Sequence, residues 1–135
     1  MCSARALQVA ATLATTLGAQ IGLVHVIDPK LVLDSGIPTD QMWTLLRREG
    51  QELLDTAAAA IPAHPHPWKF LREGPPAQAL LAAAHEWRAA FIVLGTHGRS
   101  GVTRLLLGST AEAVLRHAQC PVVIVPTSAA MEEGA

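Results

Sequence analysis

The sequence of 135 residues has little charge, few aromatic side chains and only two cysteines. Charged residues make up 16% of the chain, against about 25% in an average globular protein. The net charge of −1 gives no basic surface for nucleic acid or for an acidic membrane. Cys2 and Cys120 are too few and too far apart for a disulfide framework or a zinc site. The composition therefore excludes a disulfide-stapled scaffold and argues against a nucleic-acid partner.

Long hydrophobic runs are also missing. No apolar stretch approaches the roughly 18 residues of a transmembrane helix, and the start of the chain lacks the continuous apolar segment of a signal peptide. We therefore expect a cytoplasmic protein with no membrane partner. Half of the residues are nevertheless hydrophobic, which argues against disorder. The length predicts one domain over residues 1–135, with a core from about 3 to 126 and a frayed tail over 127–135.

The hydrophobic pattern alternates between helical and strand-like periods. Helices are predicted over Ala4–Leu17 and Gln41–Ala60, after Pro76, and from Ser109, which would form a capping box with Glu112. Strands are predicted over Ile21–Ile27, Trp68–Arg72, Phe91–Leu94 and Val122–Val125. Two prolines and Gly36 predict a loop over Pro29–Asp40. In the second helix, the pattern assigns Leu45 and Leu53, among others, to the buried side. Strands that alternate with helices indicate an α/β fold, doubly wound around a parallel sheet.

A glycine-rich segment, GTHGRSGVTRLLLGST over residues 95–110, joins an apolar strand to a helix. It matches neither the P-loop nor the dinucleotide-binding glycine pattern. Its position is nevertheless the one where α/β sheets bind ligands. Glycine amides, the free N–H groups of the helix start, the Ser109 hydroxyl and the side chains of Arg99 and Arg104 all favour an anion. The alternative is that the glycines only form turns and that Ser109 only caps the helix, and the chemistry alone leaves both open.

The spacing in this segment resembles a known family signature. Gly95 and Gly98, nine further residues and then Gly108-Ser109 match the G-2x-G-9x-G-[S/T] pattern of the universal stress protein family. Leu23–Asp28, Gly74-Pro75 and Arg116–Val125 resemble the family as well, so the similarity spans about Ser3 to Pro126. Members with this signature typically bind ATP, and the resemblance therefore implies ATP, with Mg²⁺ as an optional companion, as the ligand here.

The resemblance also implies an architecture and a set of site residues. The family has a five-stranded parallel sheet of order 3-2-1-4-5, and it forms homodimers through its last strand, here Val122–Val125. Gly95 and Gly98 would line the path of the phosphates and ribose, with Arg99 adding charge. Val26 and Leu94 would flank the adenine. The phosphates would be held by Gly108, Ser109 and Thr110.

One departure from the family pattern concerns its first strand. That strand and the Asp at its end have no counterpart, since residues 1–3 align just before the first helix. The strand lies in the middle of the family's sheet. Its loss would leave neighbouring backbone groups unpaired, at about 1–3 kcal/mol for each buried group. Two explanations stay open: a protein that is longer than this sequence, or a truncated member that is unstable or supported by another chain.

The function that we expect is ATP binding by a stress-response regulator without catalytic residues. A slow ATP hydrolase is an alternative: His97, Arg99 and Ser109 supply polarity and charge near a phosphate, but no general base is evident. A nucleotide-free dimerisation module is another. No nucleophile elbow is present, and no metal site is predicted. His25 is expected to be a core or subunit-facing histidine, and Asp28 to cap a loop rather than bind Mg²⁺.

Overall fold

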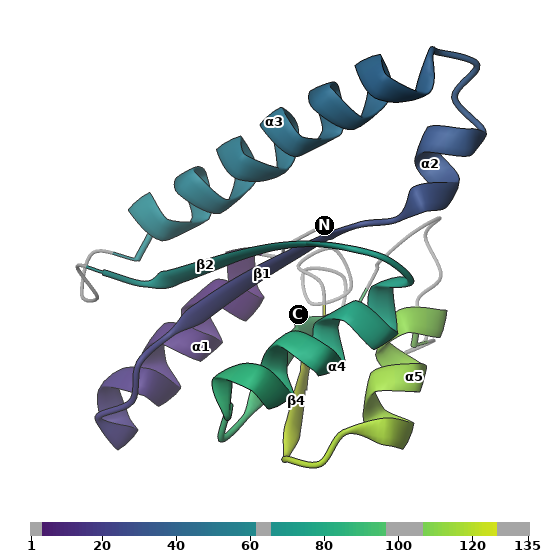
Figure 1. Ribbon diagram of the computed structural model, residues 1–135. Helices are drawn as coiled ribbons and strands as arrows, with labels where there is room; N and C mark the ends of the chain where they lie inside the picture. The colour runs from purple at the N-terminus through teal and green to yellow at the C-terminus, as the bar shows by residue number, and fades with distance from the viewer. Residues whose placement is uncertain (1–3, 62–65, 97–106, 127–135) are drawn as a thin grey trace.

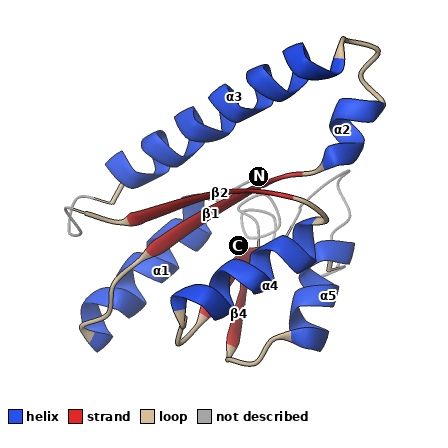
Figure 2. Cartoon of the chain, viewed as in Figure 1, coloured by secondary structure: helices blue, strands red, loops and turns tan. Residues whose placement is uncertain are grey.

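The structure is a computed structural model that describes residues 4–61, 66–96 and 107–126. Helices and strands alternate along this part of the chain, as Figures 1 and 2 show. The elements are α1 (Ala4–Leu17), β1 (Gly22–Ile27), α2 (Pro29–Leu33), α3 (Thr39–Ala59), β2 (Trp68–Glu73), α4 (Pro76–Trp87), β3 (Ile92–Gly95), α5 (Ser109–His117) and β4 (Val122–Val125). This alternation confirms the predicted α/β fold.

The described strands form two separate parallel sheets of two strands each. In one, β1 pairs with β2 from Gly22 opposite Trp68 to Ile27 opposite Glu73. In the other, β3 pairs with β4 over their full lengths. Within the described ranges, β1 and β3 each keep one edge without a strand partner. The family order 3-2-1-4-5 stays a prediction, because no described strand joins the two sheets.

Helices cover both faces of the strands. Both α3 and α4 contact β1 and β2, and Figure 1 shows them on opposite faces of this sheet. α1 contacts β3 and β4, and α5 contacts α4 and β4. Each strand is therefore placed against a helix, as in other α/β proteins with parallel sheets.

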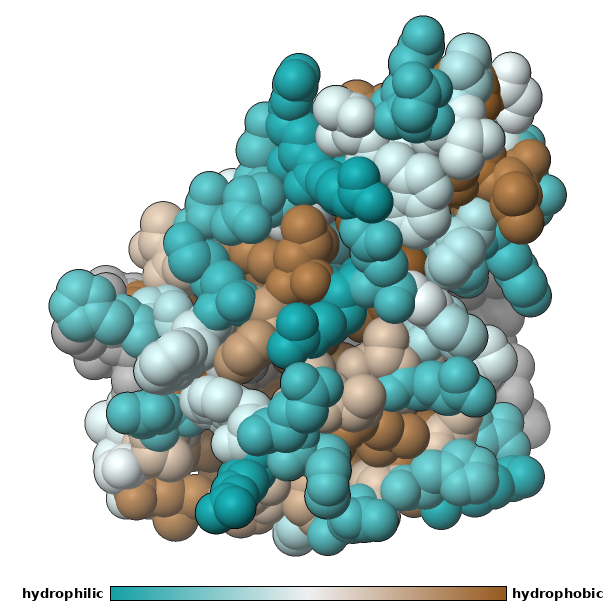
Figure 3. Space-filling view, in the orientation of Figure 1, coloured by the Kyte–Doolittle hydropathy of each residue, from teal (hydrophilic) through white to brown (hydrophobic). Residues whose placement is uncertain are grey.

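The core concentrates where α1 and α3 meet β1. Its buried members are Ala14, Ile21, Leu23, Leu54 and Ile61. Val114 of α5, a helix that contacts α4 and β4, is fully buried as well. Exposed hydrophobic residues also occur around α2, namely Leu31, Leu33 and Ile37, and Figure 3 shows hydrophobic residues gathered at the upper right, over α2.

The first helix has the bounds that the sequence predicts. Gly18 follows α1 in the left-handed region, with φ +65°, and the Ala19 N–H donates to the Ala14 carbonyl oxygen at 2.8 Å. A glycine in this position ends a helix without the cost that a Cβ would add. The helix and strand periods therefore locate this part of the fold well.

The predicted loop over Pro29–Asp40 is partly wrong, because Pro29–Leu33 forms the short helix α2. Asp28 caps it: its Oδ1 accepts a hydrogen bond of 3.0 Å from the Lys30 N–H. Pro29 occupies the first helical position, where its missing N–H costs nothing and its fixed φ suits the helix. The proline thus begins a helix here instead of excluding one, and Asp28 acts as a cap, as expected.

Candidate functional site

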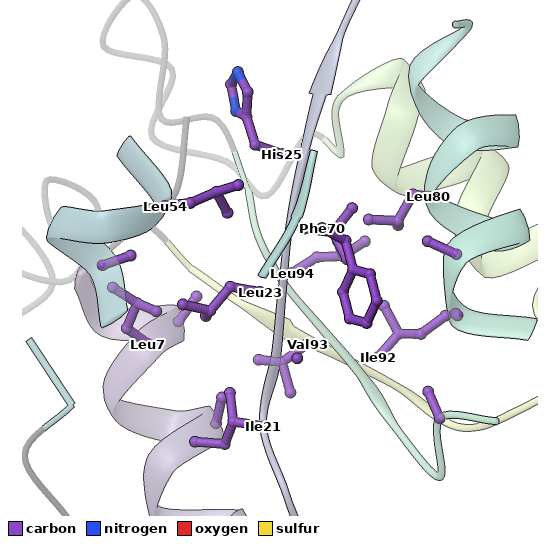
Figure 4. A pocket seen from close by; sticks show the side chains of 18 of the residues that line it. Leu7, Ile21, Leu23, His25, Leu54, Phe70, Leu80, Ile92, Val93 and Leu94 are labelled. Atoms are coloured by element: carbon purple, nitrogen blue, oxygen red, sulfur yellow. The ribbon is translucent and has the colours of Figure 1, made fainter. Parts of the chain in front are cut away.

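A cavity of about 1200 Å³ lies between the two sheets. Gly22–Val26 of β1 and Ile92–Gly95 of β3 line it along nearly their whole lengths. Side chains from α1, α3 and α4 complete its walls. Figure 4 shows Leu7 and Leu54 to one side of β1, and Leu80 and Ile92 to the other. The cavity therefore separates the unpaired edges of β1 and β3.

Five of the residues that the sequence singles out line this one cavity. Val26 lies near the carboxyl end of β1, and Leu94 and Gly95 form the carboxyl end of β3. Gly108 and Thr110 join them from the start of α5. The fold thus brings together three segments that are far apart in the chain. Ligands of α/β proteins bind at this position, outside the carboxyl ends of parallel strands.

The other three predicted residues are not placed in the cavity. Ser109 is exposed and is not among the residues that line it. Gly98 and Arg99 lie outside the described residues, as do His97 and Arg104. At the carboxyl ends of β1 and β3, the cavity is therefore lined by apolar strand residues and by the first turn of α5.

The start of α5 differs from the predicted capping box. Gly108 is the N-cap, with φ −64° and ψ 162°, and no side chain caps the helix. The Glu112 N–H donates to the Gly108 carbonyl oxygen at 3.0 Å, and the Glu112 carboxylate pairs with Arg116 at 3.0 Å. Ser109 is thus the first helical residue and not the cap. The first N–H groups of a helix have no partner within the helix and carry its positive dipole end.

His25 adds a titratable group to the cavity wall. Its ring packs against α3, since a Cβ on Gly50 would lie 2.9 Å from the His25 Cδ2. Burial lowers the pKa of His25 below its ordinary value of 6.5, because a charged imidazole loses hydration in an apolar wall. The histidine therefore favours its neutral form. Within the described ranges, no three His, Cys, Asp or Glu side chains are placed to hold a metal ion.

Sequence reasoning missed the apolar side chains that extend the cavity beyond the glycine-rich segment. Leu53, expected on the buried side of its helix, is 50% exposed and lines the cavity. Leu17 and Phe91 line it as well, at 55% and 40% exposure. Leu45, also expected to be buried, is exposed but lies elsewhere. In the sequence, the strands are apolar on both faces. This pattern indicates burial, but it does not show where a cavity lies or which side chains line it.

Comparisons with known proteins identify the family. The model of the universal stress protein family matches residues 2–126. The chain belongs to the universal stress protein family. A universal stress protein of Thermus aquaticus is 37% identical over 122 residues, which cover 90% of this chain and 88% of that protein.

Solved universal stress proteins share the fold. A member from Burkholderia pseudomallei is 33% identical, with a TM-score of 0.71 over 91% of this chain and 86% of that one. Another, solved in complex with cAMP, is 25% identical, with a TM-score of 0.63 over 92% of this chain and 87% of that one. Among the described helices of this universal stress protein, none is long and apolar enough to cross a membrane.

Proposed function

We propose that this universal stress protein binds an adenine nucleotide, ATP with or without Mg²⁺, at the carboxyl ends of β1 and β3. The observation that carries the proposal is the meeting of Val26, Leu94, Gly95, Gly108 and Thr110 in one cavity. The complex of a related universal stress protein with cAMP supports an adenine nucleotide as the class of ligand.

Each part of a nucleotide finds suitable chemistry in this arrangement. Val26 and Leu94 are apolar and half-buried, so they offer a surface to a flat base. Gly108 and Thr110 open α5, where free N–H groups and the helix dipole stabilise phosphate oxygens. Gly98, Ser109 and Arg99 belong to the proposed site through the family signature.

The role that we propose is regulatory and not catalytic, with at most slow hydrolysis. A ligand that binds only the folded state stabilises it by mass action. The protein would act in the cytoplasm, as part of a stress response. The proposal includes a homodimer through β4, whose outer edge has no strand partner among the described residues.

The test is calorimetric titration of the protein with MgATP, and the decisive variant is Gly108→Val. The Gly108 backbone angles suit any residue, so valine should leave the fold intact while its side chain keeps phosphate away from the helix start. We expect saturable binding that weakens at least about tenfold in the variant, equivalent to about 1.4 kcal/mol.

Ala118→Val is the matched control, because Ala118 has similar backbone angles at the opposite end of α5. It should bind MgATP like the parent. Equal binding by both variants, or no binding by the parent, would contradict the proposed function and leave the dimerisation module as the better description.

A further inference from the structure

The amino-terminal half of α3 extends beyond the sheet that the rest of the helix covers. α3 has 21 residues, or about 31 Å at 1.5 Å per residue, whereas β1 and β2 have six residues each, or about 20 Å. The buried residues of α3, Gly50 and Leu54, both lie in its carboxyl-terminal half. Figure 1 shows the amino-terminal end of α3 beside α2. The first turns of the helix therefore keep an outer face in contact with water.

A shallow groove of about 310 Å³ runs along this outer face. Five exposed residues of α3 line it, namely Asp40, Gln41, Thr44, Leu45 and Arg48. They recur every three or four residues, so they form one stripe along the helix. The Thr44 Oγ1 donates a hydrogen bond of 2.9 Å to the Asp40 carbonyl oxygen, which uses its hydroxyl proton within the helix. The middle of the groove therefore offers the side chain of Leu45, 42% exposed, and the methyl group of Thr44.

Opposite charges lie at the two ends of the groove. Asp40 and Arg48 are each four residues from Thr44, which corresponds to about 6 Å along the helix axis. Among the described residues, neither side chain takes part in an ion pair, whereas the adjacent Arg47 pairs with Glu73 at 2.7 Å. The groove therefore carries one unpaired anion and one unpaired cation at equal distances from its centre.

We propose that this groove binds a second copy of the chain, with the two α3 helices packed antiparallel about a two-fold axis at Thr44. In this contact Asp40 faces the partner's Arg48, and the symmetry repeats the same pair on the other side of the axis. A parallel arrangement would instead place like charges together, which is unfavourable. The groove is thus complementary to itself only in the antiparallel orientation.

Exposed apolar side chains at the same end of the molecule extend this surface. α2 contacts α3, and Leu31, Leu33 and Ile37 in and after α2 are all exposed. Leu33, at 76%, has the highest exposure among the exposed large hydrophobic residues of the described chain. A second copy packed on α3 would remove part of this apolar surface, together with Leu45, from water.

The contact through α3 differs from the homodimer through β4 that the proposed function includes. Figure 1 shows α3 and β4 on opposite sides of the molecule, so both contacts can form at once. A chain that used both would form assemblies larger than a dimer. A chain that used only α3 would stop at the dimer, because a two-fold contact is closed.

Charge reversal tests the contact, with sedimentation velocity over a concentration series as the measurement. Arg48→Glu would bring two carboxylates together at each end of the groove, and Asp40→Lys would bring two cations together. We expect each variant alone to self-associate at least tenfold more weakly than the parent. An equimolar mixture of the two variants should associate like the parent. In the mixed pair the introduced lysine meets the introduced glutamate, and the unchanged Asp40 meets the unchanged Arg48.

The mixture also separates a lost contact from a lost fold, because unfolded variants would not recover association when mixed. Ala59→Glu is the matched control. Ala59 is exposed at the other end of α3, about 16 Å along the axis from Arg48, so an added negative charge there should leave self-association unchanged.

A cysteine at the centre of the groove gives a second measurement that changes no charge. The two-fold axis would bring position 44 of the two copies together, so a short bismaleimide should join two chains of a Thr44→Cys variant. The product is measured on a denaturing gel, where a contact through β4 does not persist, and a mass spectrum of the linked peptide identifies the position joined. Ala59→Cys should give no product linked through its new cysteine.

Several outcomes would overturn the proposal. They are a parent that stays monomeric up to about 1 mM, single variants that associate like the parent, a mixture that does not recover association, or a Thr44→Cys variant that is not linked through its new cysteine. If the contact through β4 also forms, the single variants should stop at the dimer. If it does not form, they should be monomers, so a failure of the homodimer through β4 leaves this test intact. None of these measurements involves a nucleotide.

Discussion

At Gly50, α3 approaches the first sheet so closely that a side chain has no room. An ideal Cβ there would lie 2.7 Å from the Leu71 Cδ1 and 2.9 Å from the His25 Cδ2. A glycine inside a helix costs roughly 0.5–1 kcal/mol relative to alanine. Only a residue without a Cβ lets α3 lie this close to β1 and β2. The packing gained by this close contact offsets the cost of the glycine.

Valine at this position tests the close approach. We expect Gly50→Val to lower the free energy of unfolding by about 1–3 kcal/mol, the usual cost of overpacking. Ala59→Val is the control, because Ala59 is exposed on the same helix and its substitution changes mainly helix propensity. Urea denaturation measures both, and a Gly50→Val variant as stable as the control would contradict the packing argument.

Gly50 also explains why the expected burial of Leu53 is wrong. The hydrophobic period assigned Leu53 to the core, whereas the structure buries Gly50 and Leu54. Leu53 and Leu54 are adjacent and equally apolar, so the period alone discriminates poorly between them. The residue that fixes the orientation of the helix is a glycine, which carries no hydrophobic signal.

At the scale of elements, α5 buries two side chains, Ala111 and Val114, and Val114 is the larger. Val114 is 0% exposed, while its neighbour Leu115 is 41% exposed. α5 contacts α4 and β4. The burial of Val114 therefore couples the helix that opens the proposed nucleotide site to the rest of the fold.

Alanine substitutions compare the two neighbours. We expect Val114→Ala to lower the free energy of unfolding by about 2 kcal/mol, since it removes apolar contacts and leaves a cavity. Leu115→Ala removes a larger side chain but should cost less than about 1 kcal/mol, because much of that side chain is already in water. Thermal or urea unfolding decides, and a larger loss for Leu115→Ala would show that the helix packs through a different face.

Elements with a strong period were predictable, whereas helix ends set by local geometry were not. α1 has the predicted bounds because its apolar residues follow the helical period, and β4 has them because Pro121 and Pro126 bound its short apolar run. α2 was missed because Pro29 was interpreted as a loop residue. The capping box at Ser109 was wrong, since serine is favourable both as a cap and near it, and backbone geometry selects Gly108.

For the molecule as a whole, His25 should make stability depend on pH. Its pKa is lowered by burial in the folded state, so the unfolded chain binds more protons below about pH 6.5. The stability contributed by neutral His25 is present above that pH and is lost as the pH falls below it towards the lowered pKa of the folded state. The pKa values of Asp55 and Glu73 are also lowered, from 3.8 and 4.5, by hydrogen bonds to Lys69 and Arg47, respectively. Their contributions are therefore lost at more acidic pH.

Urea denaturation between pH 7.5 and 5.0 measures this dependence. The midpoint of the parent should fall with pH across this window, and His25→Leu should flatten the slope. The variant keeps an apolar side chain in the cavity wall, so it removes the titration while retaining packing. Equal slopes in the two proteins would show that other groups dominate.

The sequence pattern alone does not predict that β1 and β3 lie in two separate sheets. Composition and period located the four strands, but nothing in Gly22–Val26 or Ile92–Gly95 indicates how many neighbours each has. Both segments are apolar throughout, as central strands are. The resemblance implies a central strand between these two segments, which stays a prediction, and among the described residues both segments line one cavity.

That cavity is continuous from the strand edges to the start of α5, with Val26 and Gly95 belonging to both regions. Val26 belongs to the first sheet and Gly95 to the second, and no pair of described strands joins the two sheets. Under the proposed function, one bound nucleotide would contact both sheets and oppose their separation. Binding should then slow the hydrogen exchange of backbone amides in both sheets together, including amides that the nucleotide does not touch.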